Sequence, residues 1–428
     1  MPAATMPNAG AARTAGERVC VLHIGMHKTG TSSIQRMISE NFDELRDRFG
    51  IASYRRHLNH SALAPAFVDD LSQVRSNLAP GLEKPEDVHR QAVSAVEDLG
   101  ESLARDRPPS LVLSGEGFSK LPETAVPRLK RFLEPHFDRV HVAIYVREPF
   151  SYANSAAAQR IKVGSTFENL IADTLIHQEI YATHPDSSSV LPTYRYRIEK
   201  FVEAFGRDNV EIVPFARSAL RGQDAVNDFF WRFLAIESAE LARQPERENE
   251  ALAPAALHAL EYLNREEPVL RDGWLNPARS QSLPAKLSAL PRTGRFSIPG
   301  FDYDAFAEIV RPDVEWLEAI TGGAIAFGLE PPPPAPPPSA ADLLAIATAL
   351  NHQSVERDRQ AVRTVFFREL WRIGYGRTTD PQELIHVVKI CTEPEFLRNA
   401  AHILRVSKLP DIARIADARA AYLRSRQP

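Results

Sequence analysis

Residues 19–33 read Val-Cys-Val-Leu-His-Ile-Gly-Met-His-Lys-Thr-Gly-Thr-Ser-Ser, and they carry the clearest structural pattern of the chain. The stretch opens with a short apolar run, typical of a strand that is covered on both faces of a sheet. Beyond it, Ile34, Met37 and Ile38 recur at helical spacing, so we predict a helix that begins near Thr31 or Ser32. A buried strand, a glycine-containing loop and a helix in this order predict an α/β protein with a parallel central sheet.

The loop has the spacing of a phosphate-binding P-loop. Gly25 and Gly30 stand where such a loop has its two glycines, and Ser32 fills its hydroxyl position. The lysine is displaced, because Thr31 occupies the place directly after the second glycine and Lys28 lies three residues earlier. An ATP-binding loop uses a lysine at that place to reach the β- and γ-phosphates. We therefore predict a P-loop-type three-layer fold whose loop does not hold a triphosphate.

A phosphate at the start of the predicted helix would be bound by backbone N–H groups and by the positive end of the helix dipole. Side chains of the loop would add charge and hydroxyl donors. The predicted contacts are Lys28, Thr29, Gly30, Thr31, Ser32 and Ser33. A lysine near the bridging oxygen would also stabilise the charge on a departing phosphate, which makes Lys28 a catalytic candidate.

A second anion site is predicted further along the chain. Residues 140–146 alternate with the period of a strand, which ends in Arg147. Pro149 breaks this strand, and we expect Ser151 to cap a helix that carries Ser155. Arg147 offers a forked cation and Ser155 a hydroxyl donor, and both would converge on one anion.

The segment from His23 to Thr31 resembles the loop that grips the 5′-phosphosulfate in sulfotransferases that use 3′-phosphoadenosine 5′-phosphosulfate (PAPS), and the bacterial members are the most similar. The resemblance implies that Arg147 and Ser155 hold the 3′-phosphate of the nucleotide. It covers roughly residues 18–328, with specific motifs only at the two phosphate sites. It implies an enzyme that transfers the sulfuryl group of PAPS, its cosubstrate, to a hydroxyl or an amine by in-line displacement, with no metal expected.

The acceptor must lose a proton, so we expect a base near the sulfur. Residues 110–113 predict a third strand, and Glu116 follows it at the rim that Gly25 and Arg147 share. Glutamate is the base in several branches of the resembled family and histidine in others, which makes His60 the competing candidate. The sequence leaves this choice open.

Two other functions remain open on the residues alone. One is a P-loop kinase or phosphotransferase that uses ATP, although the missing lysine after Gly30 argues against it. The other is a catalytically silent scaffold that keeps a nucleotide-binding loop. The acceptor is not encoded in any motif, so a glycan, a lipid, a peptide and a small metabolite all remain candidates.

Downstream, the patterns predict packing elements to which we assign no chemistry. Residues 196–205 predict an amphipathic helix that ends at Gly206, and residues 210–215 predict a fourth strand. Residues 228–234 predict the helix after it.

Length and composition predict more than one domain. The chain has 428 residues, of which 44% are hydrophobic and 25% charged, as in globular proteins. We expect a flexible tail over residues 1–17, the catalytic domain over 18–329, a proline-rich linker over 330–339 and an all-helical module over 340–428. The role of the module is not encoded; docking and self-association are the roles considered.

Other classes are disfavoured by composition. The net charge is −4, and basic residues are interspersed with acids, so we expect no nucleic-acid partner. No segment approaches the ~18 apolar residues of a membrane span, and the first 17 residues lack the apolar core of a signal peptide. Cys20 and Cys391 are too few and too far apart for a disulfide framework or a metal site. We therefore expect a cytoplasmic protein.

Overall fold

The computed structural model describes residues 16–54, 59–74, 84–172, 190–245, 252–266, 270–271, 274–275, 287, 295–333, 388, 394–406 and 409–424. The chain divides into two compact units. The first comprises Met1–Ala156, Ala172–Asn249 and Gly300–Pro332, and the second comprises Ala157–Ile171, Glu250–Pro299 and Pro333–Pro428.

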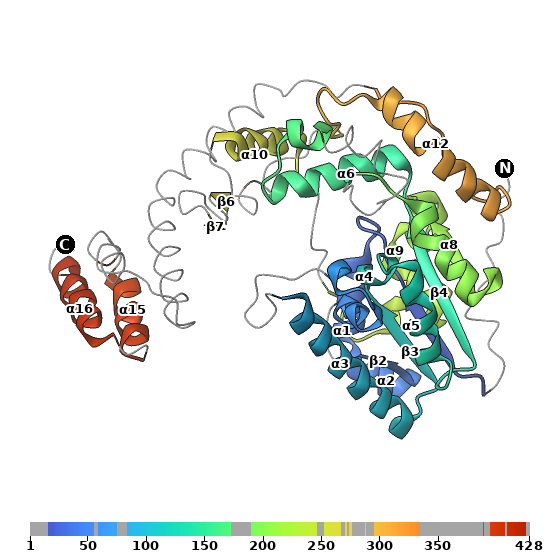
Figure 1. Ribbon diagram of the computed structural model, residues 1–428, viewed down its shortest axis with the longest axis horizontal. Helices are drawn as coiled ribbons and strands as arrows, with labels where there is room; N and C mark the ends of the chain where they lie inside the picture. Colours follow the sequence, from blue (N-terminus) through green and yellow to red (C-terminus); the bar gives the residue numbers. More distant parts are fainter. Residues whose placement is uncertain are drawn as a thin grey trace. The chain divides into compact units, whose positions relative to one another are not determined.

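A five-stranded sheet forms the centre of the first unit (Figure 1). Its strands are β1 (Val19–His23), β2 (Ile51–Ser53), β3 (Ser110–Ser114), β4 (Arg139–Val146) and β5 (Val210–Pro214). They lie in the order β2-β3-β1-β4-β5, and every neighbouring pair is parallel. The α/β class and the parallel central sheet that the sequence predicts are therefore confirmed.

Helices cover both faces of this sheet, because neighbouring residues of a strand point to opposite faces and all five residues of β1 are buried. On one face Val21 packs with residues of α1 (Thr31–Glu40), α2 (Phe42–Phe49) and α9 (Ala225–Phe229). None of the residues of α8 (Tyr194–Phe205) belongs to that core; α8 instead contacts β4 and β5, and α5 (Val126–Leu133) packs against α8.

Several element boundaries differ from the sequence prediction. The edge strand β2 was not predicted, because its three residues are too few to show a period. Helix α6 (Pro149–Lys162) is not capped by Ser151; the Glu148 carboxylate accepts the backbone N–H groups of Phe150 and Ser151, each at 2.8 Å. Helix α8 begins two residues earlier than predicted and ends, as predicted, at Gly206.

The remaining elements of the first unit include α3 (Pro85–Asp106), α4 (Glu116–Ser119) and α12 (Tyr303–Ile320). The second unit contains α10 (Pro254–Glu266), the short antiparallel pair β6 (Leu270–Arg271) and β7 (Trp274–Leu275), and the helices α15 (Pro394–Val406) and α16 (Pro410–Arg424). Helices α15 and α16 share an apolar core.

The predicted helical module over 340–428 falls largely outside the described residues, and α15 and α16 are its described helices. The predicted linker over 330–339 is described only as far as residue 333. These domain boundaries and the flexible tail over 1–17 therefore stay predictions.

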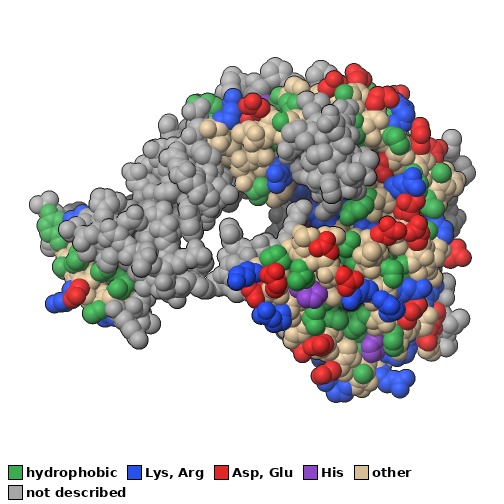
Figure 2. Space-filling model, viewed as in Figure 1, with side chains coloured by type: hydrophobic (Ala, Val, Ile, Leu, Met, Phe, Trp, Pro, Cys, Tyr) green, Lys and Arg blue, Asp and Glu red, His purple; other side chains and the backbone are tan. Residues whose placement is uncertain are grey.

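Acidic and basic side chains are interspersed over the visible face of the described residues (Figure 2). Within the described part of the chain, no helix combines the length and the apolar character that crossing a membrane would require.

Candidate functional site

The carboxyl ends of β1 and β4 lie side by side at the topological switch point of the sheet, where the strand order reverses. From β1 the chain continues to β2 at one edge, whereas from β4 it continues to β5 at the opposite edge. In open parallel sheets, ligands bind in the crevice that such a reversal leaves at the carboxyl ends. The loops that follow β1 and β4 are therefore the place to look for a site.

The β1–α1 loop, residues 24–30, has a tightly constrained backbone. A Cβ atom on Gly25 would stand 2.8 Å from the Thr31 Oγ1 atom, so only glycine fits there. Lys28 and Gly30 both adopt left-handed backbone, with φ values of 67° and 78°. A lysine in this conformation costs about 1–3 kcal/mol, a strain that is found mostly at functional loops.

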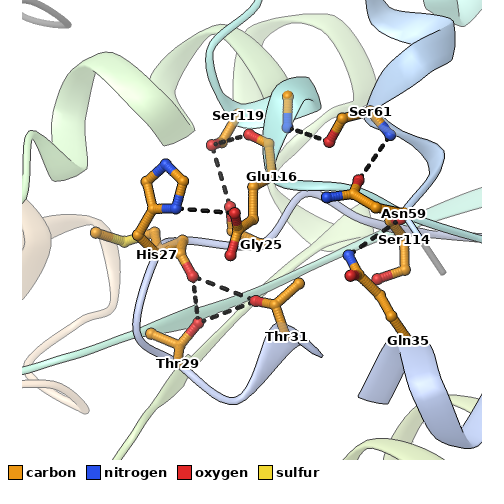
Figure 3. A network of polar contacts seen from close by, with 12 residues as sticks. Gly25, His27, Thr29, Thr31, Gln35, Asn59, Ser61, Ser114, Glu116 and Ser119 are labelled. Carbon is orange, nitrogen blue, oxygen red and sulfur yellow. Dashed lines mark hydrogen bonds and ion pairs between the residues drawn. The ribbon is translucent and has the colours of Figure 1, made fainter. Parts of the chain in front are cut away.

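Two of the predicted hydroxyl contacts are used inside the loop (Figure 3). The Thr29 hydroxyl donates to the Met26 carbonyl at 2.7 Å, and the Thr31 hydroxyl donates to the same carbonyl at 3.2 Å. Ser32 and Ser33, by contrast, are exposed. The backbone N–H groups of Thr31 and Ser32 have no carbonyl partner among the described residues. Two N–H donors at the positive end of α1 are therefore available to an anion.

Arg147 lies beside this loop, directly after β4. Its Nη1 atom donates to the Lys28 carbonyl at 3.1 Å, and its guanidinium lies 5.8 Å from the centre of the Phe215 ring. The Tyr194 hydroxyl donates to the Arg147 carbonyl and fixes the backbone at this point. Burial lowers the pKa of Arg147, because a partly dry environment disfavours its charge.

Within the described part of the chain, no carboxylate forms an ion pair with the Arg147 guanidinium. The neighbouring Glu148 carboxylate is engaged at the start of α6 by two backbone N–H groups. The charge of Glu148 opposes the lowering of the Arg147 pKa in part. A bound anion would further stabilise this half-buried guanidinium, which forms no ion pair among the described residues, because a buried charge without an ion pair is costly.

Ser155 lies on α6, the helix that begins two residues after Arg147, and is half-buried. The Tyr303 hydroxyl donates to the side-chain oxygen of the adjacent Asn154 at 2.6 Å and so anchors this turn of the helix. No hydrogen bond joins Arg147 and Ser155 among the described residues, so their convergence on one anion stays a prediction.

Glu116 is brought to the β1–α1 loop, as its position on the rim predicts. It is the first residue of α4, and its Cγ atom would lie 3.5 Å from a Cβ atom on Gly25. Its Oε2 atom is 2.8 Å from the Nδ1 atom of His27, a residue of the loop itself (Figure 3). The side chains of His27 and Glu116 are 42% and 23% exposed.

Helix α4 is tied to the loop and to the segment that follows β2, which fixes the position of Glu116. The Ser119 hydroxyl donates to the Gly25 carbonyl at 3.1 Å. The backbone N–H of Gly117 donates to the Ser61 hydroxyl at 2.7 Å. Because these bonds already order the backbone of α4, little further conformational entropy is lost when the Glu116 carboxylate contacts a bound group.

His60 is placed differently from Glu116. It is buried, and its Nδ1 atom accepts the backbone N–H of Ser114 at 3.0 Å. A neutral imidazole that accepts at one nitrogen carries its proton on the other, and the His60 Nε2 atom lies 3.4 Å from the Ser53 hydroxyl. Both ring nitrogens are thus engaged inside the protein, which favours a role in holding the end of β3 over a role as base.

His23 ends β1 beneath the loop and is fully buried. Its Nδ1 atom is 2.8 Å from the Ser114 hydroxyl, and its Nε2 atom has no hydrogen-bond partner in the described part of the chain. Burial lowers the pKa of His23 from 6.5 to about 4, while the nearby Glu116 carboxylate opposes the shift in part. His23 is therefore neutral at pH 7.

No family model, no curated protein and no solved structure matches this chain. No cluster of three or more His, Cys, Asp and Glu side chains suited to a metal ion occurs among the described residues. The functional conclusion therefore depends on the geometry of the site itself.

The sequence prediction missed His27. Its pairing with Glu116 joins residues 89 positions apart, so no local pattern reveals it. The available signal was its place inside the predicted phosphate loop, where an ionisable side chain lies close to any bound group.

Proposed function

We propose that this chain is a PAPS-dependent sulfotransferase with a P-loop-type fold. One observation supports the proposal: the N–H groups at the start of α1 and the guanidinium of Arg147 follow the adjacent strands β1 and β4, and Arg147 donates to the Lys28 carbonyl of the loop. Two anion-binding groups on one rim suit a nucleotide that carries phosphate at both its 3′ and 5′ ends.

The loop chemistry supports PAPS over ATP. The side chain after Gly30, where an ATP-binding loop has its lysine, is Thr31, and its hydroxyl is buried and donates to the Met26 carbonyl. The cation of the loop is Lys28, which is half-buried. A P-loop kinase or phosphotransferase is the second candidate, and a silent nucleotide-binding scaffold is the third.

In the proposed reaction an acceptor oxygen attacks the sulfur of PAPS in line with the bond that breaks. A new S–O bond forms, the S–O bond to the 5′-phosphate breaks, and adenosine 3′,5′-bisphosphate leaves with the electron pair. The acceptor proton passes to a base on the rim, where Glu116 is the predicted residue. Lys28 stabilises charge on the leaving phosphate, and Arg147 with Ser155 holds the 3′-phosphate.

The proposed reaction needs an acceptor with a hydroxyl group or an amine. The molecule that carries this group can be a glycan, a lipid, a peptide or a small metabolite. We expect the reaction to occur in the cytoplasm.

The test of this function compares two nucleotides. Adenosine 3′,5′-bisphosphate should raise the melting temperature, since a ligand that binds only the native state at 100 times its Kd adds about 2.7 kcal/mol of stability. ATP with Mg²⁺ at the same concentration should shift it far less, because ATP has no 3′-phosphate for Arg147. Equal shifts with both nucleotides would contradict the proposal and favour the kinase.

A further inference from the structure

We propose that His27 is the general base of this site and that Glu116 is its positioning residue, an inference that depends on the proposed sulfuryl transfer. The acceptor O–H proton moves to the His27 Nε2 atom as the oxygen attacks sulfur. Glu116 stays ionised and holds the imidazole through the Nδ1 atom. In this assignment His27 takes the role of base from the two candidates that the sequence suggested, the Glu116 carboxylate and the His60 imidazole.

The hydrogen bond between the two side chains fixes which nitrogen can act. The Glu116 Oε2 atom lies 2.8 Å from the His27 Nδ1 atom, and an ionised carboxylate only accepts hydrogen bonds. The proton of the neutral imidazole is therefore on Nδ1. The Nε2 atom then carries the lone pair that can take a proton.

The exposure of the two side chains supports the same division of roles. The His27 side chain is 42% exposed, and its Nε2 atom makes no hydrogen bond with the described residues. The Glu116 side chain is 23% exposed and already uses one carboxylate oxygen on His27. An acceptor that approaches the loop from solvent thus reaches the imidazole more readily than the carboxylate.

General chemistry also favours an imidazole. A general base works best when its proton affinity is matched to the operating pH, and imidazole is the side chain whose ordinary titration range spans neutral pH. A carboxylate paired with an imidazole orients the ring and stabilises the imidazolium that forms.

The other ionisable groups of the site do not compete for this role. His23, at the end of β1, is fully buried and neutral at pH 7. Lys28, next to His27 in the chain, and Arg147, which contacts the Lys28 carbonyl, are cations.

The decisive variant is His27→Asn. The asparagine amide nitrogen occupies nearly the place of Nδ1, so it can still donate to Glu116, but nothing replaces Nε2. We expect turnover of PAPS, with water or an alcohol as acceptor, to fall by ~10²–10⁴-fold. The matched control is His89→Asn, since the His89 Nδ1 atom also lies 2.8 Å from an oxygen, the Pro65 carbonyl. This control should retain its activity.

The split between kcat and KM separates a positioning role from a structural one. In Glu116→Gln we expect kcat to fall about 10-fold while the KM for PAPS stays unchanged, because the amide can still orient the His27 ring but does not stabilise the imidazolium that forms. Exogenous imidazole should partly restore activity to His27→Gly. An active His27→Asn together with an inactive Glu116→Gln would overturn the proposal and make Glu116 the base.

A measurement without turnover keeps this inference distinct from the proposed function. Imidazole nitrogen shifts recorded by NMR above the titration range should show the Nδ1–H tautomer for His27. The Nε2–H tautomer would overturn the assignment, whatever the reaction. If adenosine 3′,5′-bisphosphate failed to bind while the Nδ1–H tautomer was observed, the function would be wrong and the dyad geometry right.

Discussion

Arg147→Ala tests the second anion site, because the surroundings of Arg147 predict how much affinity for adenosine 3′,5′-bisphosphate the change should remove. The guanidinium is half-buried, and within the described residues it has a carbonyl partner but no carboxylate. A charge-assisted hydrogen bond to phosphate contributes about 1.5–3 kcal/mol. The partial burial of Arg147 favours the upper half of this range. Affinity for adenosine 3′,5′-bisphosphate should therefore fall by roughly 40- to 150-fold, at about 1.4 kcal/mol for each factor of ten.

The same change has a second effect that the assay must remove. It deletes the hydrogen bond from the charged guanidinium to the Lys28 carbonyl, worth about 1.5–3 kcal/mol, and so loosens the loop for every nucleotide. The informative quantity is the ratio of affinities for adenosine 3′,5′-bisphosphate and adenosine 5′-phosphate. Both are measured by titration calorimetry well below the melting temperature.

We expect Arg147→Ala to lower the affinity for adenosine 3′,5′-bisphosphate much more than the affinity for adenosine 5′-phosphate. Only the bisphosphate has the 3′-phosphate that Arg147 is proposed to hold. The control is Arg90→Ala, whose guanidinium pairs with Asp87 on the surface of α3 and should leave both affinities unchanged. Equal losses for the two nucleotides in Arg147→Ala would refute the assignment of the 3′-phosphate to this arginine.

Two further predictions concern the loop and its buried neighbour. Gly25→Ala places a methyl group 2.8 Å from the Thr31 hydroxyl, so affinity for adenosine 3′,5′-bisphosphate should fall more than about 10-fold and the free energy of unfolding by about 1–3 kcal/mol. The control is Gly328→Ala, which should change neither quantity because no atom lies within 4 Å of the added methyl group. Full binding by Gly25→Ala would show that the loop has room for a side chain at this position. His23 has a folded-state pKa of about 4 against an ordinary 6.5, so the unfolded state binds more protons between these values and stability should fall as pH drops through this window, by on the order of 3 kcal/mol. In His23→Asn, urea unfolding should show a correspondingly smaller loss between pH 6.5 and 4, and an unchanged loss would mean that other groups titrate.

The elements around the site were predictable because their signals are local. The apolar run before Gly25 and the helical spacing after Gly30 define β1 and the start of α1 within one residue. The parallel topology then places Glu116 on the rim without any knowledge of side chains.

The side-chain contacts were not predictable, because they join residues that are distant in the chain. Asn59, His60 and Ser61 are polar and suggest a surface loop, yet His60 is buried against the end of β3 by its bond to the Ser114 N–H. The Thr29 hydroxyl fits a phosphate contact by residue type, but the turn at residues 27–28 brings the Met26 carbonyl within 2.7 Å of it. Tertiary geometry decided both cases.

The central claim is that the chain transfers a sulfuryl group from PAPS. Its most direct test uses PAPS labelled at sulfur, incubated with the protein and with glycan, lipid and metabolite fractions, and follows the label and adenosine 3′,5′-bisphosphate together. We predict that label enters one fraction in step with bisphosphate release, and that His27→Asn and Arg147→Ala reduce both. Phosphoryl transfer from ATP with no transfer of labelled sulfur into any fraction would contradict the account.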